Sequence, residues 1–105
     1  MTNVDDDAEP LVLITTFIVP SAMESAFLAW WRMVKPFMAM QPGFVSARLH
    51  RSLDDSERYR FLNIAEWRGD GASKEALAKM WSAAPTLALP GFEWRPVLYE
   101  VVEAV

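Results

Sequence analysis

Asn63 and Trp67 are the side chains in this sequence whose types and spacing best suit chemistry on a bound small molecule. They lie in the apolar segment FLNIAEW, residues 61–67. If this segment is a β-strand, its period of two places Asn63, Ala65 and Trp67 on one face. A buried amide without hydrogen-bond partners costs about 1–3 kcal/mol. Asn63 therefore either bonds to neighbouring backbone beside a core tryptophan or faces a pocket, and the spacing fits both interpretations.

The pocket interpretation places aromatic side chains from two segments around Asn63. Phe27 and Trp31 lie on one apolar stripe of a predicted helix, and Phe61 opens the strand that carries the amide. With Trp67 they predict an aromatic cavity. Such a cavity suits a flat, apolar ligand with one or two oxygens, because rings stack on indoles and an amide fixes a carbonyl or phenolate. We therefore expect Phe27, Trp31 and Phe61 to bind substrate.

His50 is the only histidine in the chain, and cysteine is absent. These counts exclude most transition-metal sites, so no metal is expected. His50 itself fits three roles: an acid or base in the pocket, an axial haem ligand, or a half-exposed strand residue near the end of a hairpin. We include it among the residues expected to line the substrate site.

The composition describes a single acidic domain rich in aromatic residues. The chain has 105 residues, of which 52% are hydrophobic, with five Trp, six Phe and a formal net charge of −4. So many large apolar side chains in one small domain favour a pocket or a second subunit. The negative charge argues against a nucleic-acid partner, and no apolar stretch is long enough for a membrane span. The acidic start is unlike a signal peptide, and we expect a cytoplasmic protein.

Hydrophobic periodicity and turn residues predict strands and helices in the order β-α-β-β-α-β. The strands are expected at residues 11–19, 44–53, 58–68 and 93–104, and the helices between residue 21 and the turn at 41–44 and at 73–84. Ser21 followed by Glu24 predicts a capping box for the first helix. The order is typical of a ferredoxin-like α+β fold, a four-stranded antiparallel sheet with two helices on one face. Residues 1–10 are expected to be a disordered acidic tail and residues 11–105 the domain.

The predicted strands are apolar on both faces, although two helices can cover only one. In the second strand Val45, Ala47 and Leu49 share one face, and in the third strand Leu62 and Ile64 lie on the face opposite the amide. An antiparallel sheet with one face in water alternates more cleanly between apolar and polar residues. We therefore predict a homodimer in which two sheets pack face to face.

Residues 41–67, QPGFVSARLHRSLDDSERYRFLNIAEW, and the terminal PVLYEV at 96–101 resemble the antibiotic biosynthesis monooxygenase (ABM) family. The similarity covers most of the chain. It implies a dimeric ferredoxin-like α+β barrel and an oxygenase that needs no metal, flavin or haem. It also implies that Asn63 and Trp67 are catalytic. Asn63 holds an oxygen of the substrate or of a peroxy intermediate, and Trp67 stacks on the substrate and offers its N–H.

The sequence departs from such family members in the residues that handle protons. They carry a Tyr shortly after the Trp and an Arg on the second helix. Here residues 68–75 contain no Tyr, and the second helix has Lys74 and Lys79 but no Arg. The family also includes haem-degrading members. That activity calls for a His on or near the second helix, and this sequence has none there.

Two functions from different classes follow from the cavity. The first is a cofactor-independent monooxygenase that uses O₂ to oxidise a small aromatic molecule, anthrone- or polyketide-like, to a quinone. The second is a non-catalytic dimeric binding protein that sequesters a hydrophobic aromatic metabolite in the same cavity. Oxidation of the bound molecule distinguishes the two, because only the enzyme converts it to a product. A third hypothesis, a pure interaction module, predicts no internal cavity at all.

Overall fold

The computed structural model describes residues 10–87 and 89–105, and these form a chain of strands and helices joined by short connections. The elements are β1 (Leu11–Ile18), η1 (Ser21–Met23), α2 (Glu24–Ala39), β2 (Phe44–Arg51), β3 (Phe61–Trp67), η2 (Gly69–Ala72), α3 (Lys74–Ala83) and β4 (Glu93–Glu100), where η marks a 3₁₀ turn. The predicted order of strands and helices is confirmed. Residues 1–9 of the predicted tail lie outside the described residues.

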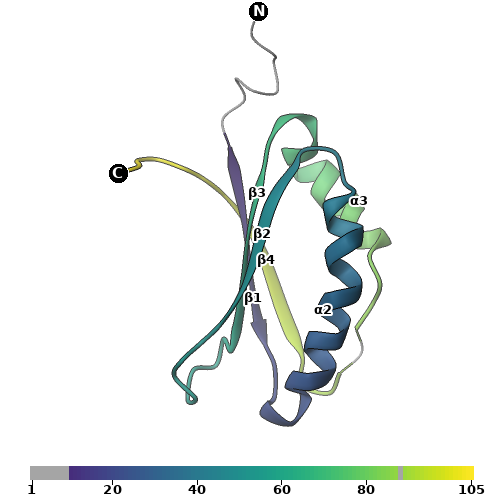
Figure 1. The fold of residues 1–105 in the computed structure, drawn as a ribbon, viewed down its shortest axis with the longest axis vertical. Helices are drawn as coiled ribbons and strands as arrows, with labels where there is room; N and C mark the ends of the chain where they lie inside the picture. The colour runs from purple at the N-terminus through teal and green to yellow at the C-terminus, as the bar shows by residue number, and fades with distance from the viewer. Residues whose placement is uncertain (1–9, 88) are drawn as a thin grey trace, which may run out of the picture.

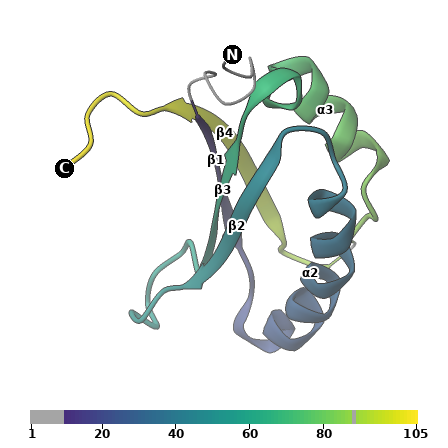
Figure 2. The ribbon, with the colours of Figure 1, turned by 45° about the horizontal axis from the view of Figure 1, so that its top comes forward.

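The four strands form one antiparallel sheet in the order β2-β3-β1-β4. Both helices lie against the same side of this sheet (Figures 1 and 2). We call this side, which carries Phe17 and Asn63, the helix face, and the side that carries Ile14 and Ile64 the open face. The ferredoxin-like α+β fold is therefore confirmed. Among the described residues, no helix is long and apolar enough to cross a membrane.

The start of β2 differs from the prediction, which placed Val45 on the same face as Ala47. A β-bulge between Phe44 and Ser46 shifts the pairing of β2 with β3. A bulge leaves its extra residue out of the ladder, and Val45 is accordingly 47% exposed. Phe44 turns toward the helix face instead, where its ring meets Trp67 edge-on with the centroids 5.3 Å apart.

The predicted capping box at Ser21 and Glu24 is wrong. A 3₁₀ turn occupies residues 21–23, α2 begins at Glu24, and no side chain caps either segment. The Glu24 carboxylate instead accepts a hydrogen bond of 3.1 Å from Nε of Arg60 and lies 3.6 Å from Nη1 of Arg51. Two cations at the base of the β2–β3 hairpin therefore hold this carboxylate away from the helix backbone.

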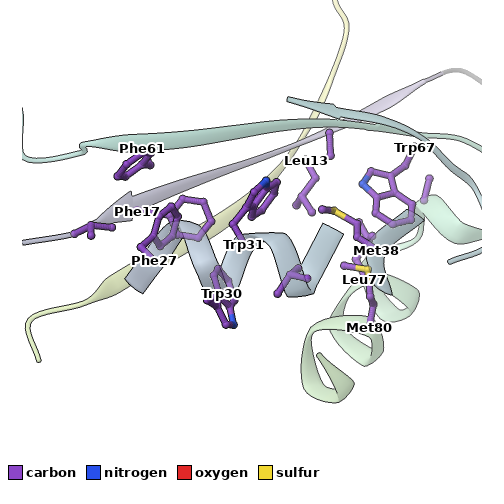
Figure 3. Close-up of a cluster of buried hydrophobic side chains, with 14 residues drawn as sticks. Leu13, Phe17, Phe27, Trp30, Trp31, Met38, Phe61, Trp67, Leu77 and Met80 are labelled. Atoms are coloured by element: carbon purple, nitrogen blue, oxygen red, sulfur yellow. The ribbon is translucent and has the colours of Figure 1, made fainter. Parts of the chain in front are cut away.

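The core lies between the helix face and the two helices, and it has two parts (Figure 3). Aromatic rings fill the part near the start of α2. There the ring centroids of Phe17 and Phe27 are 4.9 Å apart, and those of Phe27 and Phe61 are 4.7 Å apart. In the other part, Met38 and residues of α3 pack beside Trp67. The sheet between these two parts carries the side chains that bear on function.

Phe17→Ala tests the aromatic part of the core. Phe17 is 0% exposed, and its removal leaves a cavity, so we expect the free energy of unfolding to fall by about 3–5 kcal/mol. The fully exposed Leu53 provides the control, since Leu53→Ala should change this free energy by less than about 0.5 kcal/mol. Urea denaturation followed by tryptophan fluorescence measures both. Equal effects of the two substitutions would contradict this description of the core.

Candidate active site

The register of the sheet places a pair of polar side chains in the middle of the helix face. Thr15 of β1 lies directly opposite Asn63 of β3, and the same row continues to Leu49 on β2 and Pro96 on β4. Directly opposed residues in antiparallel strands have Cβ atoms about 4.5–5.5 Å apart, so the hydroxyl and the amide are neighbours. Trp67 projects from the same face, about 13 Å along the strand from Asn63. We call Thr15, Asn63 and Trp67 the polar site.

The polar atoms of this site are buried and have no partner among the described residues. Thr15, Asn63 and Trp67 are each 0% exposed. The Thr15 hydroxyl, both amide atoms of Asn63 and the indole N–H of Trp67 make no hydrogen bond to any described residue. Each such group costs about 1–3 kcal/mol. The interpretation in which Asn63 bonds to neighbouring backbone is therefore wrong, and the site is costly for the fold alone.

Short side chains lie between the amide and the indole. One row toward the end of β3, Ala65 pairs with Ala47 of β2. One row toward its start, Phe61 pairs with Phe17 of β1. Beyond Asn63 the helix face therefore carries alanines on β3 and β2, with Leu13 of β1 in the same row, and before Asn63 it is aromatic. Short side chains between two hydrogen-bonding groups suit a planar molecule that carries oxygen atoms.

Two cavities lie on the helix side of the sheet, and Thr15, Asn63 and Trp67 line neither of them. One, of about 350 Å³, lies between α2 and β2, and its lining includes Trp31, Met38 and Ala47. Met38 also lies beside Trp67 (Figure 3). The other, of about 420 Å³, lies between α3 and β4 and reaches Leu13. Both volumes fall within the range of small-molecule pockets, about 300–1,000 Å³.

Five of the six predicted site residues lie on this side of the sheet. Asn63, Trp67 and Phe61 project from the helix face of β3. Phe27 and Trp31 project from α2 toward it (Figure 3). Phe27 and Phe61 pack against each other within the aromatic part of the core, whereas Trp31 lines the cavity between α2 and β2. Their contact with a ligand stays a prediction.

His50 does not join the other predicted site residues. It pairs with Leu62 of β3 and is exposed on the open face. Because neighbouring residues of a strand project to opposite faces, His50 and Asn63 lie on opposite sides of the sheet. The expectation that His50 lines the same cavity is therefore wrong. The register places Leu49 opposite Asn63 instead.

Thr15 is the member of the polar site that the sequence interpretation missed. The sequence does contain a sign of it, because Thr15 places a hydroxyl between Leu13 and Phe17 on the same face of an otherwise apolar strand. Nothing local shows, however, that this hydroxyl faces Asn63. That proximity depends on the pairing of β1 with β3, which are more than 40 residues apart along the chain.

The polar site has hydrogen-bonding groups but no side chain that ionises near neutral pH. Asp54 lies elsewhere, in the exposed loop between β2 and β3, where hydrogen bonds from Ser56 lower the pKa of its carboxyl. Among the described residues, no cluster of His, Cys, Asp and Glu is suited to hold a metal ion. The arrangement can therefore orient a guest and stabilise charge on its oxygen atoms, but it does not itself supply a base.

Comparison with known proteins places this chain in a family. A scan of protein-family models and a search of curated proteins gave no match. Among solved structures, a candidate monooxygenase from Shewanella loihica PV-4 is 34% identical, with a TM-score of 0.74 over 92% of this chain and 98% of that one. The haem-degrading protein of Mycobacterium tuberculosis is 26% identical, with a TM-score of 0.61 over 93% and 97%. SnoaB, a cofactor-independent oxygenase from Streptomyces nogalater, is 22% identical, with a TM-score of 0.61 over 93% and 98%.

The chain belongs to the antibiotic biosynthesis monooxygenase family. This assignment rests on the 34% sequence identity to the Shewanella protein. Candidate members of the family from Bordetella bronchiseptica and Nitrosomonas europaea share the fold. The family resemblance of residues 41–67 is thereby confirmed.

Thr15→Val tests whether the polar site is unpaired. The substitution keeps the shape of the side chain and removes a buried hydroxyl without a partner, so the free energy of unfolding should rise by about 1–3 kcal/mol. Thr16→Val, at the next position on the open face, should change it by less than about 0.5 kcal/mol. Urea denaturation of both variants measures the difference. A loss of stability in Thr15→Val would show that the hydroxyl is hydrogen-bonded.

Proposed function

We propose that this protein is a cofactor-independent monooxygenase that oxidises an aromatic, anthrone-like molecule with O₂ to a quinone. The observation that carries the proposal is the fully buried Asn63, whose amide has neither its donor nor its acceptor paired with a described residue. Membership of a family of monooxygenases supports the reaction class. Two cavities of small-molecule size on the same side of the sheet support room for a guest there.

The reaction requires little of the protein beyond orientation and charge stabilisation. A ring CH₂ of the anthrone becomes a carbonyl, one atom of O₂ enters that carbonyl, and the other leaves as water with the two hydrogens. The deprotonated substrate is electron-rich enough to transfer an electron to O₂. Negative charge develops on the substrate oxygen and on the peroxy group. Preorganised donors in a site without water stabilise such charge most strongly.

Each member of the polar site has a role in this proposal. The Nδ2 group of Asn63 donates a hydrogen bond to the developing oxyanion, and the indole of Trp67 stacks on the ring and donates from Nε1. The Thr15 hydroxyl, opposite Asn63, donates to or accepts from the second oxygen. Because these side chains do not ionise near neutral pH, deprotonation depends on the acidity of the substrate itself.

Oxygen consumption with anthrone tests the proposal directly. The wild-type protein without added cofactor should consume O₂ and produce anthraquinone. Asn63→Leu, which keeps a similar volume, should lower kcat by about 10²–10³-fold, as loss of one oxyanion donor does. Thr16→Val on the open face is the control and should retain the wild-type rate.

The outcome also separates an enzyme from a binding protein. Urea denaturation of Asn63→Leu must show that the variant is folded. If wild type and Asn63→Leu then consume O₂ equally, the catalytic proposal is wrong. If anthrone quenches tryptophan fluorescence but no anthraquinone forms, the non-catalytic binding protein replaces it.

We further propose that the protein is a homodimer whose open faces pack together. The centre of the open face is a row of Ile64, Ile14 and Val97 on β3, β1 and β4. Ile64 is 39% exposed and Tyr99, on the next row, is 49% exposed. Figure 2 shows the face bare of helices on the side away from α2 and α3. An apolar sheet face of this kind favours burial against a second sheet.

Ile64→Asp tests the dimer by sedimentation velocity. The wild-type protein should sediment with twice the mass of one chain, and Ile64→Asp should sediment as a monomer, because the interface would have to bury an unpaired carboxylate. Met33→Asp is the control, since Met33 is 61% exposed on α2, away from the open face. A monomeric wild type, or a dimeric Ile64→Asp, would contradict the proposal.

A further inference from the structure

Three tryptophans form a continuous row between the helix face and the surface. The ring centroids of Trp31 and Trp30 are 6.5 Å apart, and those of Trp30 and Trp94 are 6.4 Å apart. Trp30 and Trp31 lie on α2, and Trp94 lies near the start of β4. Aromatic rings that pack against each other have centroids about 4.5–7 Å apart. The row, which we call the tryptophan chain, is therefore unbroken from Trp31 to Trp94.

The inner end of the tryptophan chain lies beside the helix face of the sheet. Trp31 is 6% exposed and projects from α2 toward the strands (Figure 3). With Ala47 it lines the cavity between α2 and β2. Ala47 pairs in turn with Ala65, which is next to Asn63 on the helix face of β3. Because indole is among the side chains that lose one electron most easily, an oxidant formed on this face can oxidise Trp31.

The outer end of the tryptophan chain reaches water. Trp94 is 38% exposed, whereas Trp30 and Trp31 are each 6% exposed. Loss of one electron gives an indole a positive charge, and burial disfavours a charged group. The charge is therefore more stable on Trp94 than on Trp31. A hole, the vacancy that the lost electron leaves, accordingly moves outward along the chain.

Hydrogen bonding distinguishes the route from its surroundings. The indole N–H of Trp30 donates a hydrogen bond of 2.9 Å to the carbonyl oxygen of Pro85. Such a bond stabilises the oxidised ring, because the positive charge strengthens the N–H as a donor. Trp81 meets Trp94 edge-on with the centroids 4.7 Å apart, but its buried N–H makes no hydrogen bond to any described residue. Trp30 is therefore a step on the route, and Trp81 is a poorer place for the hole.

We propose that Trp31, Trp30 and Trp94 carry holes from the helix face to the surface, where an enediol reductant of the ascorbate type removes them. The proposal rests on the proposed function, which supplies the oxidant. Electron transfer from the deprotonated substrate to O₂ leaves a substrate radical and superoxide. When superoxide escapes, the substrate radical adds a second O₂ and becomes a peroxyl radical. The tryptophan chain protects the buried rings from that radical.

Atoms and electrons balance along this route. The peroxyl radical takes one electron from Trp31 and, with one proton from water, becomes a hydroperoxide. One electron passes from Trp30 to Trp31 and another from Trp94 to Trp30. The oxidised Trp94 releases its N–H proton to water. Ascorbate then gives Trp94 one electron and one proton and leaves as the ascorbyl radical, so that one hydrogen atom in total moves from ascorbate to the peroxyl radical.

A photo-oxidant attached beside Trp31 tests the tryptophan chain without any substrate. The sequence has no cysteine, and Ala39 is exposed and lines the same cavity as Trp31, so Ala39→Cys takes a ruthenium polypyridyl maleimide at one position. A flash of light with a sacrificial cobalt(III) acceptor oxidises the label, which then withdraws one electron from the protein. Transient absorption follows the indolyl radical and its reduction by added ascorbate.

Trp94→Phe in the labelled protein should slow this reduction, because the hole then stays on buried rings. The second-order rate constant should fall about sixfold, the ratio of the exposed fractions of Trp94 and Trp31, 38% and 6%. Trp81→Phe is the matched control and should leave the rate constant unchanged. An unchanged rate constant in Trp94→Phe, or an equal fall in Trp81→Phe, would overturn the proposal.

Mass spectrometry locates the hole independently of the rate. After repeated flashes in air without ascorbate, oxidised indole should accumulate at Trp94 in the labelled protein and at Trp30 or Trp31 in its Trp94→Phe variant. Urea denaturation of each variant confirms that it is folded. Oxidation confined to Trp31 in the labelled protein that retains Trp94 would show that the hole does not travel, and the proposal would be wrong.

This experiment and anthrone oxidation fail independently, because the label supplies the oxidant. If holes reach Trp94 but wild type oxidises no anthrone, the proposed function fails and the tryptophan chain remains. If wild type oxidises anthrone but Trp94→Phe leaves the rate constant for ascorbate unchanged, the function stands and the proposal of the tryptophan chain is wrong.

Discussion

The buried amide of Asn63 is the constraint on which this structure depends. A side chain with two polar ends lies at the centre of the helix face, opposite a hydroxyl, and neither end finds a partner in the part of the chain that the structure describes. A leucine at this position would fill a similar volume without that cost. Residues that weaken a fold in this way are expected where a protein binds or reacts with something else.

The remainder of the fold holds this site dry and in place. Packed rings on one side and Met38 with α3 on the other exclude water from the sheet between them (Figure 3). Exclusion of water raises the cost of the unpaired amide, and it also raises the strength of any hydrogen bond that the amide makes to a charged oxygen. The same burial that makes the site unfavourable for the free protein makes it favourable for an oxyanion.

Much of this architecture could be predicted from the sequence, because local periodicity determines which residues form strands and helices. The alternation within FLNIAEW correctly placed Asn63 and Trp67 on one buried face. The errors arose where the outcome depends on pairing between distant segments. The register of β2 on β3 placed His50 on the open face, a bulge displaced Val45, and Arg60 drew Glu24 away from its predicted cap. The pairing of β1 with β3 likewise concealed the role of Thr15.

A crystal structure of the protein grown with anthraquinone, the expected product, tests the central claim most directly. The account predicts a quinone oxygen within hydrogen-bond distance of Nδ2 of Asn63, about 2.7–3.2 Å, with the ring system lying over Ala65 and against Trp67. A structure in which the amide of Asn63 bonds only to protein groups, with the quinone bound elsewhere or absent, would contradict it.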